Sequence, residues 1–222
     1  MLSHEGETGE MRHAHWPLFE LGVVTPRLEL RYLDDELALA IVPLIADIHD
    51  PSFMPFSVPF TDVPAPELYH EALRFFWTCR ASTRADHWRL QFAVLVGNTP
   101  VGLCDLFAEH YPTLRQFETG SWLARESQGA GLGTEMRQAA LHLGFVGLDG
   151  QFATTGAWHD NAPSLGVTRK LGYREEGRRR AMRRDAADEM IGFRMDRAHH
   201  STIRRDDIEL RGVETAREFL GL

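Results

Sequence analysis

The pattern of apolar and polar positions changes its period along the chain. Between Thr25 and Tyr32 every second residue after the proline is apolar, which is typical of a half-buried strand. Apolar residues spaced three and four apart predict helices at about 34–46, 66–82 and 133–147. The strand period returns in six later segments, of which the first two form a hairpin. These segments are 88–96, 101–106, 116–123, 151–158, 173–183 and 188–196.

Prolines and glycines divide these elements. Pro43 lies inside the first helix and predicts a kink or an early end there. Segment 51–60 contains three prolines and three phenylalanines, and therefore predicts a loop. A short helix begins at Asn161, a good capping residue, and ends at Gly172.

The ends of the chain differ from its middle. Residues 1–15 are polar and without periodicity, which predicts a disordered lead, and their three histidines lack the second ligand cluster that a metal site needs. Residues 16–197 then form one domain. We expect the extension 198–222, with a short strand pattern and a brief helix, to pack on that domain or on a second subunit.

Composition excludes several classes of protein. The chain has 222 residues, 43% of them apolar and 25% charged, as in ordinary globular proteins. A formal net charge of −8 argues against nucleic-acid binding, because phosphate contacts need a basic surface. No apolar run reaches membrane-spanning length and the start does not resemble a signal peptide, so we expect a cytoplasmic protein without a membrane partner. Cys79 and Cys104 fit buried free thiols.

A glycine-rich segment follows the predicted strand 116–123. Glycines at 129, 131 and 133 let the backbone approach a ligand closely, and the following helix adds its unpaired first-turn N–H groups, so the segment predicts a phosphate-binding loop. A Walker A loop would need lysine after Gly133, where Thr134 stands, and the chain's one lysine is Lys170. The spacing and the position deep in the chain also differ from the dinucleotide-binding fingerprint.

Three motifs occur in a characteristic order. Gln128-Gly129-Ala130-Gly131-Leu132-Gly133 matches the pattern Q/R-x-x-G-x-G/A at every fixed position. Thr25 to Arg31 reads Thr-Pro-Arg-Leu-Glu-Leu-Arg, and Asn161 to Ser164 is followed by Lys170-Leu171-Gly172-Tyr173. Together they resemble the GNAT superfamily of acyl-CoA N-acyltransferases, and within it the RimJ/RimL-like branch, over about residues 25–197. The resemblance implies a single α/β (α+β) domain whose mixed, mostly antiparallel sheet is flanked by helices and holds the cofactor in a splayed strand pair.

The resemblance also implies a co-substrate and the residues that bind it. The co-substrate is acetyl-CoA or another acyl-CoA such as succinyl-CoA, and no metal is implied. Trp122 and Leu123 should flank the pantetheine through their main-chain groups, and Asn161 and Ser164 should contact it from the next helix. The pyrophosphate is expected on the loop residues Gln128, Gly129, Ala130, Gly131, Leu132, Gly133 and Thr134.

Transfer to an amine places demands on nearby side chains. An alkylammonium with a pKa near 10 must lose a proton before it attacks, so a base is expected. Glu118 lies where the resemblance places that base; the alternative is a structural carboxylate bonded to an arginine. Thr168 stands where many relatives carry an acidic tyrosine. Ser164 is therefore the candidate that hydrogen-bonds the thioester sulfur or relays a proton, unless it only bonds its own helix.

The acceptor is less constrained by sequence. Phe53, Phe56 and Phe60 could line an acceptor pocket or pack on the core, and Ser121 replaces a tyrosine of many relatives. The loop and the acidic charge favour a small cationic amine acceptor in a homodimeric enzyme. A protein N-terminus, a lysine side chain and a non-catalytic acyl-CoA sensor are the alternatives. Arginines at 174–184 are expected mainly to form ion pairs, with binding of an anionic group as the alternative.

Overall fold

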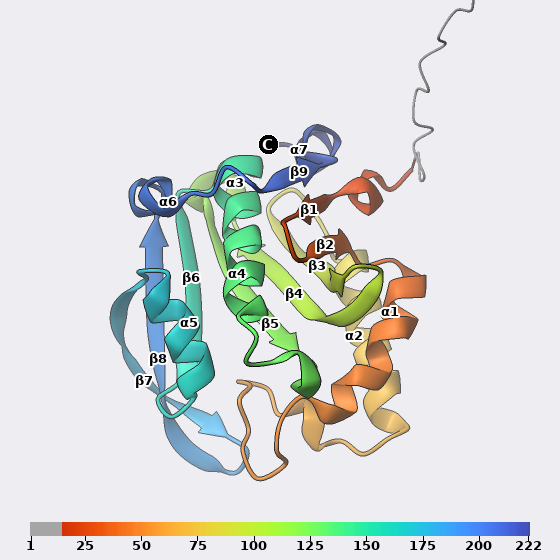
Figure 1. Ribbon diagram of the computed structural model, residues 1–222, viewed down its shortest axis with the longest axis vertical. Helices are drawn as coiled ribbons and strands as arrows, with labels where there is room; N and C mark the ends of the chain where they lie inside the picture. The colour runs from red at the N-terminus through yellow and green to blue at the C-terminus, as the bar shows by residue number, and fades with distance from the viewer. Residues whose placement is uncertain (1–14) are drawn as a thin grey trace, which may run out of the picture.

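The molecule is built on a single nine-stranded sheet (Figure 1). The computed structural model describes residues 15–222. The lead expected at 1–15 therefore lies outside the described residues, apart from His15. The strand order is β7-β8-β6-β5-β4-β3-β2-β1-β9, and every neighbouring pair is antiparallel except β5 and β6. The strands are β1 Gly22–Val24, β2 Glu29–Tyr32, β3 His87–Val96, β4 Thr99–Glu109, β5 Gln116–Leu123, β6 Phe152–Trp158, β7 Arg174–Arg183, β8 Ala186–Asp196 and β9 Glu209–Arg211.

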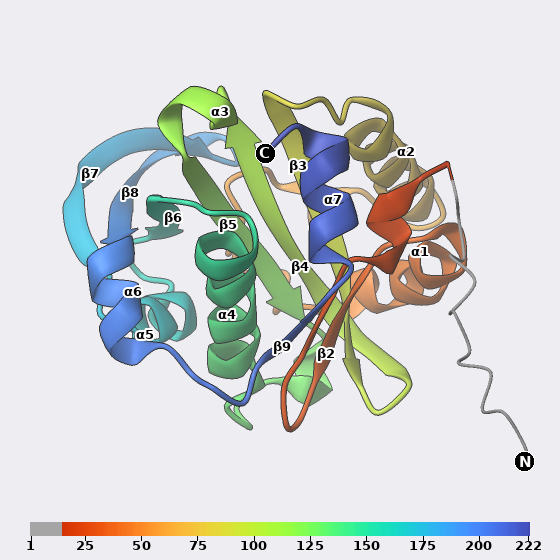
Figure 2. The same ribbon diagram turned by 90° about the horizontal axis from the view of Figure 1, so that it is seen from above.

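Helices cover both faces of this sheet (Figure 2). One face carries α4, which continues as a π-helical turn over Leu143–Gly147, and the other carries α1 and α2. No helix within residues 15–222 combines the length and apolar character needed to cross a membrane. The helices are α1 Asp35–Ile41, α2 Glu67–Ala81, α3 Tyr111–Leu114, α4 Leu132–His142, α5 Ala162–Lys170, α6 Arg197–Ile203 and α7 Val213–Leu220.

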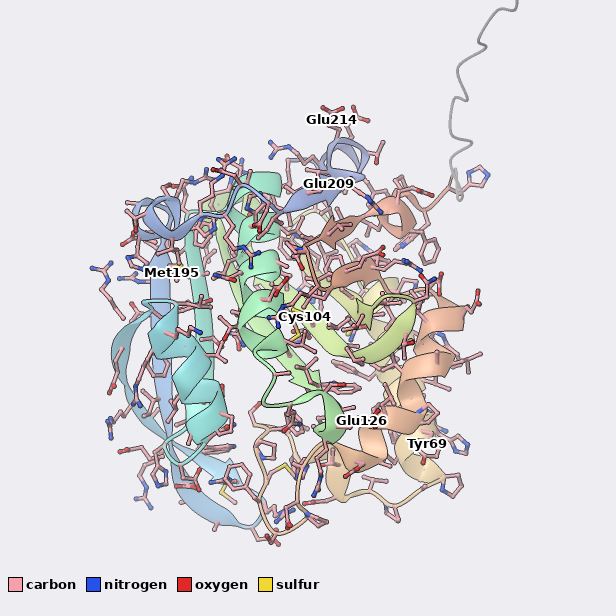
Figure 3. All side chains as sticks on the ribbon, in the orientation of Figure 1. Tyr69, Cys104, Glu126, Met195, Glu209 and Glu214 are labelled. Carbon is pink, nitrogen blue, oxygen red and sulfur yellow. The ribbon has the colours of Figure 1, made fainter. Side chains whose placement is uncertain are left out.

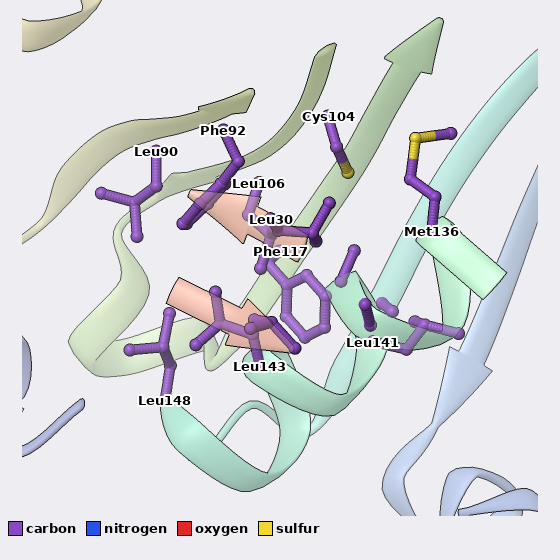
Figure 4. Packing of buried hydrophobic residues seen from close by; sticks show 14 of the residues in the cluster. Leu30, Leu90, Phe92, Cys104, Leu106, Phe117, Met136, Leu141, Leu143 and Leu148 are labelled. Carbon is purple, nitrogen blue, oxygen red and sulfur yellow. The ribbon is translucent and has the colours of Figure 1, made fainter. Parts of the chain in front are cut away.

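Two apolar clusters hold these layers together. The larger lies between the sheet and α4 and includes Leu30, Phe92, Phe117, Leu141 and Leu143 (Figure 4). Within it the rings of Phe117 and Phe145 meet edge to face, with centroids 5.2 Å apart. A Cβ at Gly144 would lie 2.1 Å from Phe117, so glycine is required for α4 to approach β5 this closely. The close approach fixes α4, and with it the loop that precedes it.

Cys104 belongs to the larger cluster and is labelled beside α4 in Figure 3, whereas Cys79 lies in α2. Both are buried and free, as predicted. Burial raises the pKa of the Cys79 thiol to about 11 and that of Cys104 to about 12. Neither thiol is therefore available as a thiolate nucleophile at neutral pH.

The N-terminal region departs from the sequence prediction. The strand expected at 25–32 covers only 29–32, because Thr25 to Leu28 form a turn in which the Thr25 N–H donates to the Leu28 carbonyl at 2.9 Å. An unpredicted strand, β1, precedes that turn and pairs with β2. The short helices α3 and α6 were also not predicted. The first helix ends at Ile41, and Pro43 lies in the 3-10 turn that follows, in agreement with the expected early end.

The C-terminal extension packs on the N-terminal part of the domain. β9 pairs with β1, which places the last strand at the edge of the sheet. From α7, Phe219 meets Trp16 edge to face at 5.0 Å, and Leu220 is fully buried in the larger cluster. The extension therefore contributes to the same core as α4.

Candidate active site

β5 and β6 separate in the middle of the sheet. They pair in parallel at three positions only, the last of which joins Glu118 to Thr154. Beyond that point β5 continues to Leu123 and β6 to Trp158, and within residues 15–222 no strand pairs with the β6-facing edge of β5. The predicted splay is therefore present, and backbone groups of β5 beyond Glu118 are available to an extended, amide-bearing ligand.

The glycine loop lies at the open end of this splay. Glu126, labelled in Figure 3, belongs to the 3-10 turn Arg125–Ser127 that links β5 to the loop. Gly129 and Gly131 have φ of 78° and 79°, in the left-handed region that favours glycine, and Gly131 is the N-cap of α4. The N-terminus of α4 thus meets an exposed loop without an acidic side chain, which suits a pyrophosphate group.

Arg27, in the β1–β2 turn, stabilises the glycine loop through its side chain. Its Nε lies 2.5 Å from Oε2 of Glu135, in the first turn of α4, and one terminal nitrogen donates to the carbonyl of Ala130 at 3.0 Å. Oε1 of Glu135 accepts from the Thr25 hydroxyl at 2.7 Å and from the Arg27 N–H at 3.2 Å. The Thr-Pro-Arg motif is recognisable in the sequence, but the role of Arg27 is not, and nothing in the sequence points to Glu135.

The Gln128 side chain is directed toward the protein. Its amide nitrogen donates to the carbonyls of Leu123 and Ile48, both at 2.8 Å. These bonds tie the loop to the end of β5 and to the segment after α1. Gln128 therefore fixes the loop through its side chain, and its backbone remains the part available to a phosphate. The Trp122 side chain packs against the smaller apolar cluster, which lies on the α1 and α2 side and includes Ile41 and Phe76. Its main chain is directed toward β4, because Trp122 pairs with Leu103 and a Cβ at Gly102 would lie 2.2 Å from its carbonyl oxygen.

Asn161 joins the start of α5 to loop 51–60. Its Oδ1 accepts from the Ser164 N–H at 3.3 Å, which caps the helix, and its Nδ2 donates to the carbonyl of Pro55 at 3.4 Å. Ser164 is partly exposed in the first turn of α5. Thr168 is buried, so the position of the usual tyrosine is occupied here by a residue of the core.

Loop 51–60 is clamped by its backbone. Trp158 Nε1 donates to the Phe56 carbonyl at 2.9 Å, and Arg183 Nε donates to the Met54 carbonyl at 2.8 Å. Phe56 and Phe60 pack on each other with centroids 4.8 Å apart, whereas Phe53 lies under the Arg183 guanidinium. All three phenylalanines are only partly buried, but the structure separates Phe53 from the other two.

Two carboxylates lie on the α2 side of β4 and β5. Successive strand residues point to opposite faces, so Glu118 points away from the cluster that holds Phe117. Asp105, on β4, is buried and pairs with Arg89 at 2.6 Å, while its other oxygen has no hydrogen-bond partner among the described residues. A Cβ at Gly120 would lie 2.5 Å from that oxygen. Asp105 was not predicted from the sequence.

Glu118 has an unusual electrostatic environment. Desolvation raises the pKa of its carboxyl, the guanidinium of Arg89 lowers it, and the charge of Asp105 raises it again, with a net increase. The side chain is still exposed, and no hydrogen bond or ion pair to another described residue involves it. The alternative of a structural carboxylate bonded to an arginine therefore has no direct contact to support it.

The arginines at 174–184 form mainly ion pairs, as expected. Arg178 pairs with Glu175 and Glu189, Arg183 with Asp160 and Asp188, and Arg184 with Asp62. Arg174 pairs with Asp196. In the described part of the chain there is no group of three or more His, Cys, Asp or Glu side chains arranged to hold a metal ion.

Comparisons with known proteins agree with this geometry. RimL, a ribosomal L7/L12 alpha-N-protein acetyltransferase solved with coenzyme A, has a TM-score of 0.64 and 18% identity over 78% of this chain and 96% of its own. Mycobacterium smegmatis RimJ, solved with CoA-disulfide, has a TM-score of 0.68 and 20% identity over 82% and 93%.

A spermidine N-acetyltransferase, a SpeG chimera from Vibrio cholerae and hSSAT, has a TM-score of 0.65 and 17% identity over 79% of this chain and 98% of its own. At these identities the likeness establishes the fold. The family model described as the acetyltransferase (GNAT) domain matches residues 27–174, which is more than half of the chain and includes the splay, the glycine loop and Asn161. The chain therefore belongs to the GNAT acetyltransferase family, as the sequence motifs indicated.

Proposed function

We propose that the protein transfers an acetyl group from acetyl-CoA to the primary amine of a small cationic molecule, by direct attack in a ternary complex. One arrangement carries this proposal. The open edge of β5 leads from the left-handed glycine loop at the start of α4 to Glu118, where β5 and β6 separate. Such an arrangement can hold an extended thioester at one end and a base at the other.

The residues around the splay fit coenzyme A. The backbone N–H groups from Gly129 to Thr134 would hold the pyrophosphate, and the main chain at Leu123 would pair with a pantetheine amide. Side-chain hydrogen bonds of Arg27 and Gln128 hold this loop in position. Bound acetyl-CoA supplies an activated acyl group, and the protein's own task is to orient it.

Glu118 is the proposed base. The acceptor nitrogen must lose a proton as it forms a bond to the acyl carbon, and a carboxylate whose pKa is raised is a better proton acceptor than an ordinary one. The departing sulfur needs a hydrogen-bond donor as the carbon–sulfur bond breaks. We assign that role to the Ser164 hydroxyl, in the first turn of α5.

The proposed acceptor surface carries one exposed carboxylate and aromatic rings. Glu118 is exposed on the side of the sheet that carries α2, where Phe56, Phe60 and Trp122 also pack, and the buried Asp105 lies on the same side. A small ammonium compound with an apolar body suits such a surface better than an anion does. The same fold serves a protein acetyltransferase in RimL and a spermidine acetyltransferase in SpeG, so protein amines are the second candidate class.

Release of free thiol from acetyl-CoA tests the proposal. The purified protein should release thiol with at least one member of a panel of cationic amines, and less with matched peptide N-termini or lysine peptides. Controls without amine measure hydrolysis. If peptides are acetylated faster than every small amine, the second class replaces the first. Absence of thiol release with all acceptors, together with retained binding of acetyl-CoA, would instead indicate an acyl-CoA sensor.

A further inference from the structure

Arg137, in the second turn of α4, is a buried cation without an anionic partner. Its side chain is directed into the sheet and the residue is only 6% exposed. One terminal nitrogen donates to the Thr155 hydroxyl at 3.2 Å and the other to the Ser121 hydroxyl at 3.4 Å. Both partners are neutral, and no ion pair among residues 15–222 involves Arg137. A buried guanidinium held only by hydroxyl groups is costly, which calls for a missing partner.

The Arg137 side chain lies at the point where β5 and β6 separate. Thr155 is the first residue of β6 beyond the paired positions, and its hydroxyl donates to the carbonyl of Thr119 at 3.1 Å. Ser121 lies two residues further along β5. The guanidinium therefore spans the base of the splay from one strand to the other, on the α4 face, while Glu118 points to the opposite face.

Several buried polar atoms at and around the Arg137 guanidinium lack hydrogen-bond partners among the described residues. Arg137 Nε, the Thr119 hydroxyl and the Tyr173 hydroxyl are buried without a hydrogen-bond partner within the described chain. Desolvation raises the pKa of Tyr173 and the nearby Arg137 lowers it, with Thr119 acting in the same direction as Arg137, which places these groups close together. The two hydroxyls can donate as well as accept, whereas Nε of arginine can only donate. What this cluster lacks is a negatively charged acceptor.

We propose that Arg137, assisted by the hydroxyls of Thr119 and Tyr173, binds a negatively charged oxygen on the acyl half of the donor thioester. The inference rests on the proposed function, because it requires the thioester to reach the base of the splay. During transfer the amine nitrogen bonds to the acyl carbon, and electrons move onto the acyl oxygen before the carbon–sulfur bond breaks and the thiolate takes a proton. A fixed cation in a water-poor site stabilises that oxygen.

Two groups on the acyl half of the donor can supply the negatively charged oxygen. The charged oxygen is either the thioester carbonyl oxygen as it gains charge, which every acyl donor has, or the terminal carboxylate of a dicarboxylic acyl group such as succinyl. The first source predicts equal dependence on Arg137 for all donors. The second predicts dependence for succinyl-CoA alone. The two faces of the sheet then have different roles: the α4 face holds the acyl oxygen, and the α2 face holds the amine and its base.

Arg137→Met and Arg137→Lys, measured with acetyl-CoA and succinyl-CoA, test this inference. For the methionine variant we expect affinity for free CoA to stay unchanged and kcat to fall about 100-fold with at least one donor, as when an oxyanion donor is removed. If the bound group is the thioester carbonyl, the carbonyl stretch of bound, ¹³C-labelled acyl-CoA should lie lower in the wild type than in the variant, because hydrogen bonding polarises the carbonyl. Lysine should restore part of both effects.

Variants of the neighbouring groups protect the test against loss of folding. Thr155→Val removes a hydrogen-bond partner of Arg137 with little change in volume, and should give a smaller loss of kcat than Arg137→Met, together with the lower thermal stability that follows from the loss of two buried hydrogen bonds. An unchanged carbonyl stretch and kcat in Arg137→Met would overturn the inference. Equal losses of affinity for CoA and for both acyl-CoAs, with lowered thermal stability, would also overturn it and leave a structural role. Absence of turnover in the wild type contradicts the proposed function instead.

Discussion

Arg27 and Glu135 are separated by more than 100 positions in the sequence, yet Nε of the first lies 2.5 Å from Oε2 of the second. The pair joins the β1–β2 turn to the first turn of α4. Burial raises the pKa of the Glu135 carboxyl, but hydrogen bonds from Thr25 and Arg27 lower it overall, so the carboxylate stays ionised. Because Arg27 also donates to Ala130, the pair positions the loop that we assign to the pyrophosphate.

Loss of this pair should weaken binding of the donor. For Glu135→Gln and Arg27→Ala we expect a higher KM for acetyl-CoA, a smaller change in kcat and a loss of about 1–3 kcal/mol in the free energy of unfolding. A double variant should cost less than the sum of the two. Arg31→Ala is the matched control, since its pair with Glu29 at 2.9 Å lies outside the loop. Additive effects on KM would disprove the coupling.

Gly131 should be intolerant of alanine. Its φ of 79° costs a residue with a Cβ about 1–2 kcal/mol, and the added atom would lie 3.5 Å from a terminal nitrogen of Arg27. We therefore expect Gly131→Ala to lower affinity for CoA in calorimetric titrations. Gly166→Ala provides the comparison: it lies within α5 with open space around it, and should gain about 0.5–1 kcal/mol of stability. Unchanged affinity in Gly131→Ala would exclude this loop geometry from binding.

Replacement of Glu118 should separate activity from stability. We expect Glu118→Gln to reduce kcat by about 10²–10⁴-fold, the usual contribution of a general base. Because the folded protein raises the pKa of this carboxyl, its ionised form is disfavoured in the fold at neutral pH. The melting temperature at pH 7 should thus stay equal or rise. In the wild type, kcat/KM should fall as pH decreases through the raised pKa. A large loss of stability with intact kcat would indicate a structural carboxylate.

His200 should make stability depend on pH. The imidazole is buried and stacks on Phe145 at 4.6 Å, and desolvation, aided by His142 and nearby arginines, lowers its pKa to about 4. Between about pH 6.5 and 4 the unfolded chain binds a proton that the folded protein excludes, so the free energy of unfolding decreases as pH falls through this range. His200→Phe should flatten that slope.

The C-terminal extension should be required for a stable fold. Deletion of residues 207–222 removes β9 and α7 and uncovers the edge of β1, so we expect a large drop in the melting temperature. Leu220→Ala alone should cost about 2–5 kcal/mol, since the side chain is fully buried. A truncated chain that melts like the full one would make the extension dispensable.

Light scattering on the full chain tests the predicted homodimer.

The sequence by itself determined the elements whose signals are local. The period of apolar residues located β5, β6, α2 and α4 to within a few residues, because each is long enough to repeat its pattern. The glycine loop was equally readable, since left-handed φ angles at 129 and 131 favour glycine directly. These local signals indicated the family and the site that we propose for the donor.

Only the tertiary structure decided which distant side chains act together. β1 has three residues and α3 four, too few to show a period, and both depend on partners elsewhere in the chain. The sequence likewise gives no sign that Glu135 meets Arg27, that Asp105 lies opposite Gly120, or that Arg137 reaches the base of the splay. A charged residue reads as solvent-exposed in sequence, and its burial is set by long-range packing of the sheet against α4.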